Sequence, residues 1–135
     1  MQWDFTKRIE DMSPEEVSDR IKSAYEYEMP KIVPIPYVGV EGEVVEYEYP
    51  ELTALCPMTG IQDLYNISIV FVPNKFVPEL KSLKFYFLAF RDLPISHEHL
   101  ASKIEEEFRS VINPEEIQVT LDVAVRGGIK TTIVV

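Results

Sequence analysis

Two residues between positions 50 and 64 have the side chains needed for covalent catalysis. Cys56 lies in the stretch ELTALCPMTGIQD, where Pro57 and Gly60 interrupt regular structure, and Asp63 follows it by seven residues. A thiolate in an exposed loop can attack an electrophilic carbon, while a nearby carboxylic acid donates or shuttles a proton. Composition alone favours a simpler interpretation of Cys56 as a small buried hydrophobic residue, because free cysteine is usually buried.

Two histidines flank a glutamate at the start of a predicted helix, in the order His97-Glu98-His99. These side chains can bind metals, but neighbouring residues on a helix point in different directions, and no cysteine or histidine cluster accompanies them. The sequence therefore predicts no metal site. The simpler interpretation is that Glu98 favours the positive helix N-terminus while the histidines lie at the surface.

Three cations stand out in a chain whose net charge is −10, namely Lys81, Lys84 and Arg126. Arg126 precedes Gly127-Gly128, whose backbone could approach a phosphate closely. Neither of the common glycine-rich nucleotide-binding patterns occurs, so a nicotinamide cofactor would need an unusual site. Solvated surface charge is the simpler explanation of these residues.

The elements that must position these residues follow from hydrophobic periodicity. Alternation predicts four strands and a three- or four-residue repeat predicts two helices between the second and third of them. The strands are expected at 38–49, 64–72, 117–125 and 129–135, and the helices at 78–90 and 96–112. This ββααββ order predicts an α+β fold, in which a four-stranded antiparallel sheet carries two helices on one face.

Finer expectations follow for the loop and for the two helices. The segment 51–63 is expected to be the loop that carries Cys56. In the first helix, the apolar positions at helical spacing should face the core, and in the second the charged positions should be solvated. The apolar positions are Leu80, Leu83, Phe87 and Phe90, and the charged positions are Lys103, Glu105, Glu106 and Arg109.

Residues 1–36 are expected to form an appendage to this core. Ser13 and Glu16 make a capping-box pair around Pro14, so a helix should begin there, and a proline-spaced extended segment should follow it. The whole chain, 1–135, is expected to be a single domain.

Charge and composition argue against several kinds of partner. The net charge of −10 and the pI near 4.6 disfavour broad capture of nucleic acid or anionic lipid. No apolar stretch is long enough to span a membrane, the N-terminus lacks the apolar core of a signal peptide, and the single cysteine cannot form an intrachain disulfide. We therefore expect a cytoplasmic protein without membrane contact.

Taken together, four blocks resemble the family of NADPH-dependent nitrile reductases that act on 7-cyano-7-deazaguanine. In order, they are LTALCPMTGIQD, PELKSLKFYF, FRDLPISHEH and RGGI, and the second contains the family's NADPH motif at residues 79–84. The resemblance implies a tunnelling fold (T-fold), in which protomers of a homo-oligomer join their sheets into a barrel. It also implies sites between protomers, so that Cys56 and Glu98 can come from different chains.

The same resemblance implies roles for individual residues in reducing the nitrile to 7-aminomethyl-7-deazaguanine, a step of queuosine biosynthesis. Cys56 is the nucleophile that forms a thioimidate, Asp63 is the proton donor, and His97 is a second proton donor. The residues implied in binding the substrate are Pro78, Glu79, Leu80, His97 and Glu98. The residues implied in binding NADPH are Leu80, Lys81, Lys84, Arg126 and Gly127.

Two other functions stay open on the sequence. The related archaeosine-forming amidinotransferase makes the same thioimidate on tRNA but resolves it with ammonia, and it typically lacks the motif found at residues 79–84. A non-catalytic purine- or pterin-binding protein of the same fold would leave Cys56 packed in its loop. The motif and the acidic charge favour the reductase, which needs no direct contact with nucleic acid.

Overall fold

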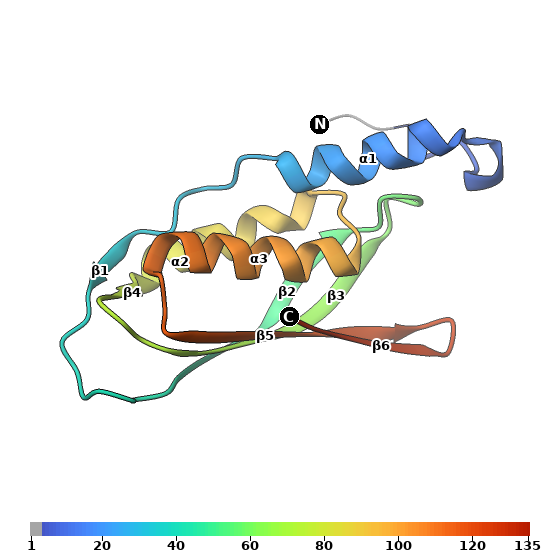
Figure 1. The fold of residues 1–135 in the computed structure, drawn as a ribbon. Coiled ribbons are helices and arrows are strands. Elements are labelled where there is room, and N and C mark those ends of the chain that lie inside the picture. Colours follow the sequence, from blue (N-terminus) through green and yellow to red (C-terminus); the bar gives the residue numbers. More distant parts are fainter. Residues whose placement is uncertain (1–3) are drawn as a thin grey trace.

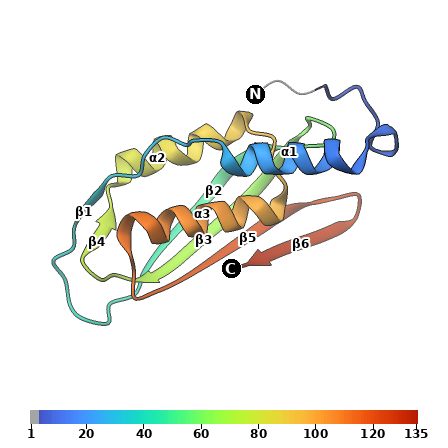
Figure 2. The ribbon, with the colours of Figure 1, turned by 45° about the horizontal axis from the view of Figure 1, so that its top comes forward.

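The main sheet has four antiparallel strands in the order β2-β3-β5-β6, and two helices cover one of its faces (Figures 1 and 2). The structure is a computed structural model and describes residues 4–135. The strands are β2 (Val45–Leu55), β3 (Gln62–Val72), β5 (Glu116–Arg126) and β6 (Ile129–Val134), and the helices are α2 (Leu80–Leu88) and α3 (His97–Ile112), joined through the 3₁₀ helix η2 (Ala89–Asp92). The α+β class and the ββααββ order expected from the sequence are confirmed.

The core lies between the sheet and these helices, where the apolar face of the strands packs against the apolar face of the helices. Alternate residues of β3 and β5 point toward the helices, and an apolar residue of α3 points toward the sheet at about every fourth position. The buried side chains are Tyr65, Ile67, Ile69 and Phe71 from β3, Val119, Leu121 and Val123 from β5, and Leu100, Ile104, Phe108 and Ile112 from α3. Burial of this continuous apolar layer is the main favourable contribution to folding.

Strand β2 begins and ends later than the sequence predicted. Residues 38–44 lie in a loop, where Gly42 has a φ of +80°, and the strand continues through the residues 51–55 that were expected to be a loop. The pairing with β3 is irregular between Tyr49 and Leu52. This irregularity accommodates Pro50, which lacks the N–H of a regular ladder, on an edge strand of the sheet.

Helix α2 begins two residues later than predicted, because Pro78 belongs to the short strand β4 (Phe76–Pro78). Strand β4 pairs with β1 (Pro34–Pro36), and Glu79 caps the helix through its side chain. The expectation that Leu80 faces the core is wrong, since its side chain is exposed, and Tyr86 joins Leu83 and Phe87 in the core instead. In α3, Ser96 occupies the predicted N-cap position, but its hydroxyl contacts the Nδ1 atom of His99.

The N-terminal segment consists of η1 (Ile9–Asp11), α1 (Pro14–Glu26) and β1. Figure 1 shows α1 on the outer side of α2 and α3, away from the sheet. The Ser13 hydroxyl accepts a hydrogen bond from the backbone of Glu16 at 3.1 Å, as the capping signal predicted. Ala24, Met29 and Ile32 are buried in the same core as the sheet, so the segment packs closely against the rest of the chain.

A buried lysine holds the end of α1. The expectation that Lys103 and Glu105 are solvated is wrong, because only 6% and 7% of their surfaces are exposed. The Lys103 ammonium donates to the carbonyl oxygens of Tyr25 at 2.7 Å and Tyr27 at 2.8 Å. A cation beside the last carbonyls of a helix satisfies groups that the helix itself leaves unpaired, so Lys103 fixes α1 to α3.

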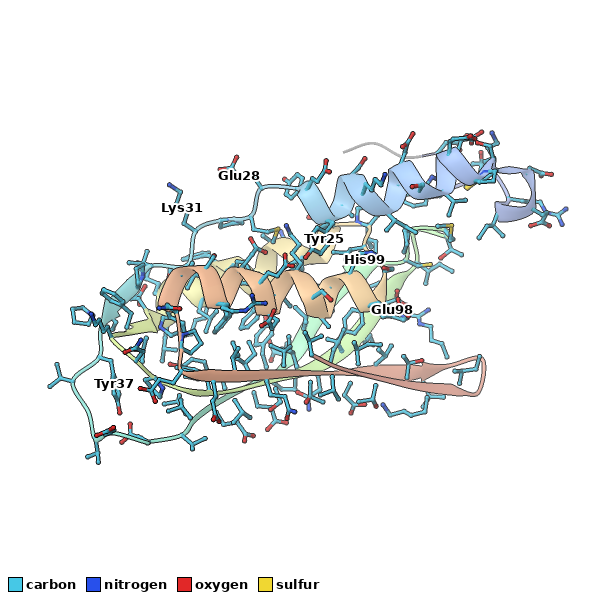
Figure 3. The ribbon with its side chains drawn as sticks, viewed as in Figure 1. Tyr25, Glu28, Lys31, Tyr37, Glu98 and His99 are labelled. Carbon is cyan, nitrogen blue, oxygen red and sulfur yellow. The ribbon has the colours of Figure 1, made fainter. Side chains whose placement is uncertain are left out.

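We expect Lys103→Met to lower the free energy of unfolding by about 2 kcal/mol, because two carbonyl groups lose a charged donor. Denaturation in urea, followed by circular dichroism, measures this difference. Lys31→Met is the matched control, since the Lys31 side chain extends away from the protein (Figure 3) and its loss should change stability by less than about 0.5 kcal/mol. Equal stabilities of the two variants would contradict the anchoring role.

Candidate functional site

Cys56 begins a tight turn between β2 and β3. Its N–H donates to the carbonyl oxygen of Ile61 at 2.8 Å, and its own carbonyl accepts from the N–H of Gly60 at 2.9 Å. Gly60 has a φ of +71°, a conformation that side-chain-bearing residues rarely adopt. Cys56 itself is partly exposed and is not in a disulfide. The turn therefore presents a free thiol at the end of the sheet.

The start of α3 lies beside this turn because the chain pairs with the last residue of β2. The N–H of Leu55 donates to the carbonyl of Leu93, and the N–H of Ile95 donates to the carbonyl of Leu55, both at 3.0 Å. Residues 93–95 thus add a short parallel bridge next to Cys56. His97 and Glu98 follow directly, and Figure 3 shows Glu98 at this end of α3.

A tyrosine that the sequence analysis did not identify links the sheet to His97. The Tyr65 hydroxyl lies 2.8 Å from the Nδ1 atom of His97, and the two rings meet edge to face. Burial raises the pKa of Tyr65 well above its ordinary value, and the negative charges of Asp63, Cys56 and Glu98 raise it further. The phenol therefore keeps its proton and can donate it to Nδ1, which leaves the ring proton of a neutral His97 on Nε2.

Asp63 and Arg126 form an ion pair at the same end of the sheet. Only 5% of Asp63 is exposed, and its Oδ1 atom lies 3.4 Å from the Nε atom of Arg126. The guanidinium also donates to the carbonyl oxygen of Gln62. A buried carboxylate needs a partner of opposite charge, and Arg126 supplies it. Asp63, Tyr65, His97, Glu98 and Arg126 thus gather at the end of the sheet that carries the Cys56 turn.

The resemblance residues from Pro78 to Lys84 lie at the other end of the molecule. Pro78 is in β4, and Glu79 to Lys84 form the first turns of α2, which Figure 1 places opposite the β2–β3 turn and the β5–β6 hairpin. The Glu79 carboxylate accepts from the N–H groups of Lys81 at 2.7 Å and Ser82 at 2.8 Å. Within one chain, Glu79 and Lys81 therefore lie far from Cys56. Glu98 of the same chain lies at the Cys56 end, since the charges of Cys56 and Glu98 both raise the pKa of Tyr65.

A cavity of about 240 Å³ lies beside the predicted cofactor residues of α2. It is lined by Glu46, Tyr47, Glu48 and Tyr49 of β2 and by Leu80, Leu83, Lys84 and Phe87 of α2. The Tyr49 and Phe87 rings are stacked there, with centroids 4.8 Å apart. Lys81 and Lys84 are exposed, and Gly127 at the opposite end has a φ of +57° with open space where a Cβ would be. Ammonium groups and an open backbone suit the phosphates of an anionic dinucleotide. In one chain, however, the lysines of α2 and the backbone of Gly127 lie at opposite ends of the molecule.

Residues 4–135 meet neither the requirements for a metal cluster nor those for a membrane-spanning helix. No cluster of three or more histidine, cysteine, aspartate or glutamate side chains in this range could hold a metal ion. Among the same residues, no helix combines the length and the apolar character needed to cross a membrane.

The capping role of Glu79 makes a prediction about pH. The N–H groups of Lys81 and Ser82 hold the pKa of Glu79 below its ordinary value of 4.5. A lowered pKa in the folded state means that the carboxylate stabilises the protein above pH 4.5, and that this contribution is lost as the pH falls through the lower, folded-state pKa. We expect Glu79→Gln to be less stable than the wild type at neutral pH and to approach it in acid.

Urea denaturation across this pH range measures the difference between Glu79→Gln and the wild type. Glu28→Gln is the matched control, because the Glu28 side chain extends away from the protein (Figure 3). A stability difference at Glu79 that does not change with pH would contradict the capping role of its charge.

Comparisons with known proteins agree in pointing to one family. A sequence model of the family described as "QueF-like protein" matches residues 63–135. The NADPH-dependent 7-cyano-7-deazaguanine reductase of Chloroherpeton thalassium is 39% identical over 89 residues, which cover 66% of this chain and 77% of that protein. The protein of the same name from Elusimicrobium minutum is 40% identical over 90 residues, covering 67% of this chain and 68% of its own.

A solved structure also shares the fold. The crystal structure of the archaeosine synthase QueF-Like in the apo form superposes with a TM-score of 0.65 and covers 71% of this chain and 94% of its own. Its sequence identity is 22%, so this likeness concerns the fold alone. It confirms the tunnelling fold that the resemblance implied.

Proposed function

The chain belongs to the QueF-like protein family, and on this premise we propose that it is an NADPH-dependent reductase of the nitrile of 7-cyano-7-deazaguanine in queuosine biosynthesis. The product is the primary amine, 7-aminomethyl-7-deazaguanine. The names of the curated relatives support the substrate and the cofactor. The structural observation that carries the proposal is the free thiol of Cys56 in the β2–β3 turn, at the end of the sheet where Asp63 pairs with Arg126 and Tyr65 with His97.

The first step is addition of the Cys56 sulfur to the nitrile carbon. The S–H bond breaks, a C–S bond forms, one C–N bond order is lost, and the nitrogen takes up a proton to give a thioimidate. Asp63, which is paired with Arg126, relays the proton from the thiol to the nitrogen. Arg126 stabilises Asp63 before and after this transfer.

His97 is the second proton donor. The Tyr65 hydroxyl at Nδ1 holds the imidazole in the tautomer that carries a proton on Nε2. This proton would go to the nitrogen as hydride is added to the carbon. When the C–S bond then breaks, the nitrogen lone pair expels Cys56 and the sulfur recovers a proton. Tyr65 thus acts through His97, and its raised pKa keeps it a donor over the neutral range.

The substrate-binding residues come from both ends of the molecule. Carboxylates suit the hydrogen-bond donors of a guanine-like base, and Glu98 stands next to His97 at the Cys56 end. Glu79, with the backbone of Pro78 and Leu80, lies at the opposite end of the chain. We therefore assign Glu79 to the site of a neighbouring protomer, where the free edges of β2 and β6 extend the sheet into a barrel.

The cofactor site divides in the same way. Leu80 and Lys84 line the cavity of α2 and Lys81 lies on the same helix, while Arg126, which pairs with Asp63, and Gly127 lie at the other end of the chain. The two lysines would bind phosphate groups, and the Gly127 backbone would allow a close approach. NADPH held by these residues would supply the two hydrides, or four electrons, that the conversion of nitrile to amine requires. The proposal further places a single domain of residues 1–135 in the cytoplasm, without direct contact to nucleic acid.

The test mixes the protein with 7-cyano-7-deazaguanine and measures intact mass before NADPH or ammonia is added. We expect an adduct equal to the mass of the protein plus one nitrile, followed by two equivalents of NADPH oxidised for each amine formed. An adduct that ignores NADPH and reacts with ammonia would identify an amidinotransferase instead. Absence of any adduct would leave a binding protein and refute the covalent mechanism.

A further inference from the structure

A guanidinium from the N-terminal helix contacts the turn that carries Cys56. Arg20 lies on α1, and its Nη1 atom donates to the carbonyl oxygen of Pro57, the residue after Cys56, at 3.0 Å. Its Nη2 atom donates to the carbonyl oxygen of Asp4 at 2.5 Å. Because the donors of a guanidinium are fixed in one plane, the two bonds together set the orientation of the Pro57 carbonyl relative to α1.

A second contact from the same segment reaches the other limb of the turn. The ring of Phe5 packs against Gly60, where a Cβ would lie 2.8 Å from the ring. The guanidinium of Arg20 lies over this ring, 5.8 Å from its centroid. Pro57 and Gly60, which lie on the two limbs of the turn, are therefore both held by the N-terminal segment, and a side chain at position 60 would displace Phe5.

The helix that carries Arg20 is itself fixed to the core. Ala24, one turn further along α1, is fully buried, and the Lys103 ammonium binds the carbonyls that end the helix. The hydrogen bonds inside the turn link only residues of the turn, so they do not orient it relative to α1. The hydrogen bond from Arg20 to the Pro57 carbonyl connects the turn to α1. The part of the chain matched by the family, residues 63–135, includes neither Arg20 nor Cys56.

We propose that Arg20 is a positioning residue for the covalent step. By holding the Pro57 carbonyl, it fixes the backbone next to Cys56 in the orientation from which the sulfur reaches the nitrile carbon. This inference rests on the proposed function. A displacement of about 1 Å at a reacting atom can slow a reaction by on the order of 10²-fold, so a single backbone contact can have a large kinetic effect.

The test compares Arg20→Ala and Arg20→Lys with the wild type in the chain of 135 residues. Lys22→Ala is the matched control, because Lys22 is an exposed cation on the same helix. Intact mass follows adduct formation with 7-cyano-7-deazaguanine over time, and Cys56 is the only thiol in the chain. Hydrogen exchange of the Cys56 and Gly60 amides reports the order of the turn independently of any substrate.

We expect Arg20→Ala to form the adduct at least about tenfold more slowly at saturating nitrile, with the half-saturating concentration changed by less than about twofold. Its Cys56 and Gly60 amides should exchange faster, and Lys22→Ala should match the wild type. Arg20→Lys keeps the positive charge but loses the planar pair of donors, so its rate of adduct formation should lie between those of Arg20→Ala and the wild type. If Arg20→Ala does not fold, Arg20→Lys decides, and a wild-type rate for it overturns the proposal.

Other outcomes separate this inference from the proposed function. A wild type that forms adduct, together with an Arg20→Ala variant that forms it equally fast, overturns the positioning role and leaves the reductase standing. A wild type that forms no adduct counts against the proposed function itself. In that case, unchanged amide exchange in Arg20→Ala would also show that the Arg20–Pro57 contact does not order the turn. Faster exchange would show that the contact orders the turn without a role in this reaction.

Discussion

Cys56→Ala is expected to abolish both the covalent adduct and the oxidation of NADPH. Removing a nucleophile typically lowers turnover by on the order of 10⁴-fold or more, because the remaining groups can bind and polarise a substrate but cannot form the intermediate. Cys56 is partly exposed in a turn, so the substitution should change the free energy of unfolding by less than about 0.5 kcal/mol. Loss of activity would therefore not reflect unfolding.

Intact mass spectrometry after addition of 7-cyano-7-deazaguanine, combined with the decrease in NADPH absorbance, measures both effects. Cys56→Ser is the matched control for size, and its weaker nucleophile should leave it nearly as inactive. Binding of the nitrile to Cys56→Ala should persist, since Glu98 and His97 are unchanged. Full reduction by Cys56→Ala would falsify the covalent mechanism and require direct attack of hydride on the nitrile.

Mixing two inactive variants is expected to restore activity, because the residues of the proposed site occupy opposite ends of one chain. Cys56→Ala removes the nucleophile at one end, and the double variant Lys81→Ala/Lys84→Ala removes the phosphate-binding cations at the other. The double variant alone should lose on the order of 10²-fold in NADPH-dependent turnover. In randomly mixed oligomers, about a quarter of the interfaces combine one intact end from each chain.

The variants are dissociated together in denaturant and reassembled before NADPH oxidation is measured. The control mixes Cys56→Ala with Asp63→Asn, two defects at the same end, for which no interface contains an intact set. Restoration in the first mixture and not in the second places the site between protomers. Equal activity in both mixtures, or none in the first despite mixed assembly, would show that the two ends do not cooperate across an interface.

The local elements of this fold were predictable because neighbours in the sequence determine them. Ser13 and Pro14 mark the start of α1, alternation in β3 and β5 identifies their buried face, and Gly127-Gly128 marks the final hairpin. The prediction went wrong where a distant part of the chain overrides the local signal. Strand β2 continues past Pro50 because β3 pairs with it, and Pro78 enters β4 because β1 lies beside it.

The burial of charged side chains could not be predicted from the sequence either. Lys103 lies on the polar face of the predicted helix, and only the packing of α1 brings two carbonyl oxygens to its ammonium group. Tyr65 shares the inward face of β3 with Asp63, which is a signal that alternation could have supplied. Its contact with His97 nevertheless depends on the pairing of Leu55 with residues 93–95.

For the site, the sequence by itself determined which residues can react and in what order they occur. The side chains of Cys56, Asp63 and His97 allow nucleophilic and acid–base chemistry, and the family resemblance, which includes the motif at residues 79–84, implied the thioimidate and the dinucleotide. Only the tertiary structure decided that these residues separate into two groups, one around the β2–β3 turn and one at the start of α2. The reason is physical: side-chain chemistry is a property of each residue, whereas distance within a folded chain depends on how helices and strands pack.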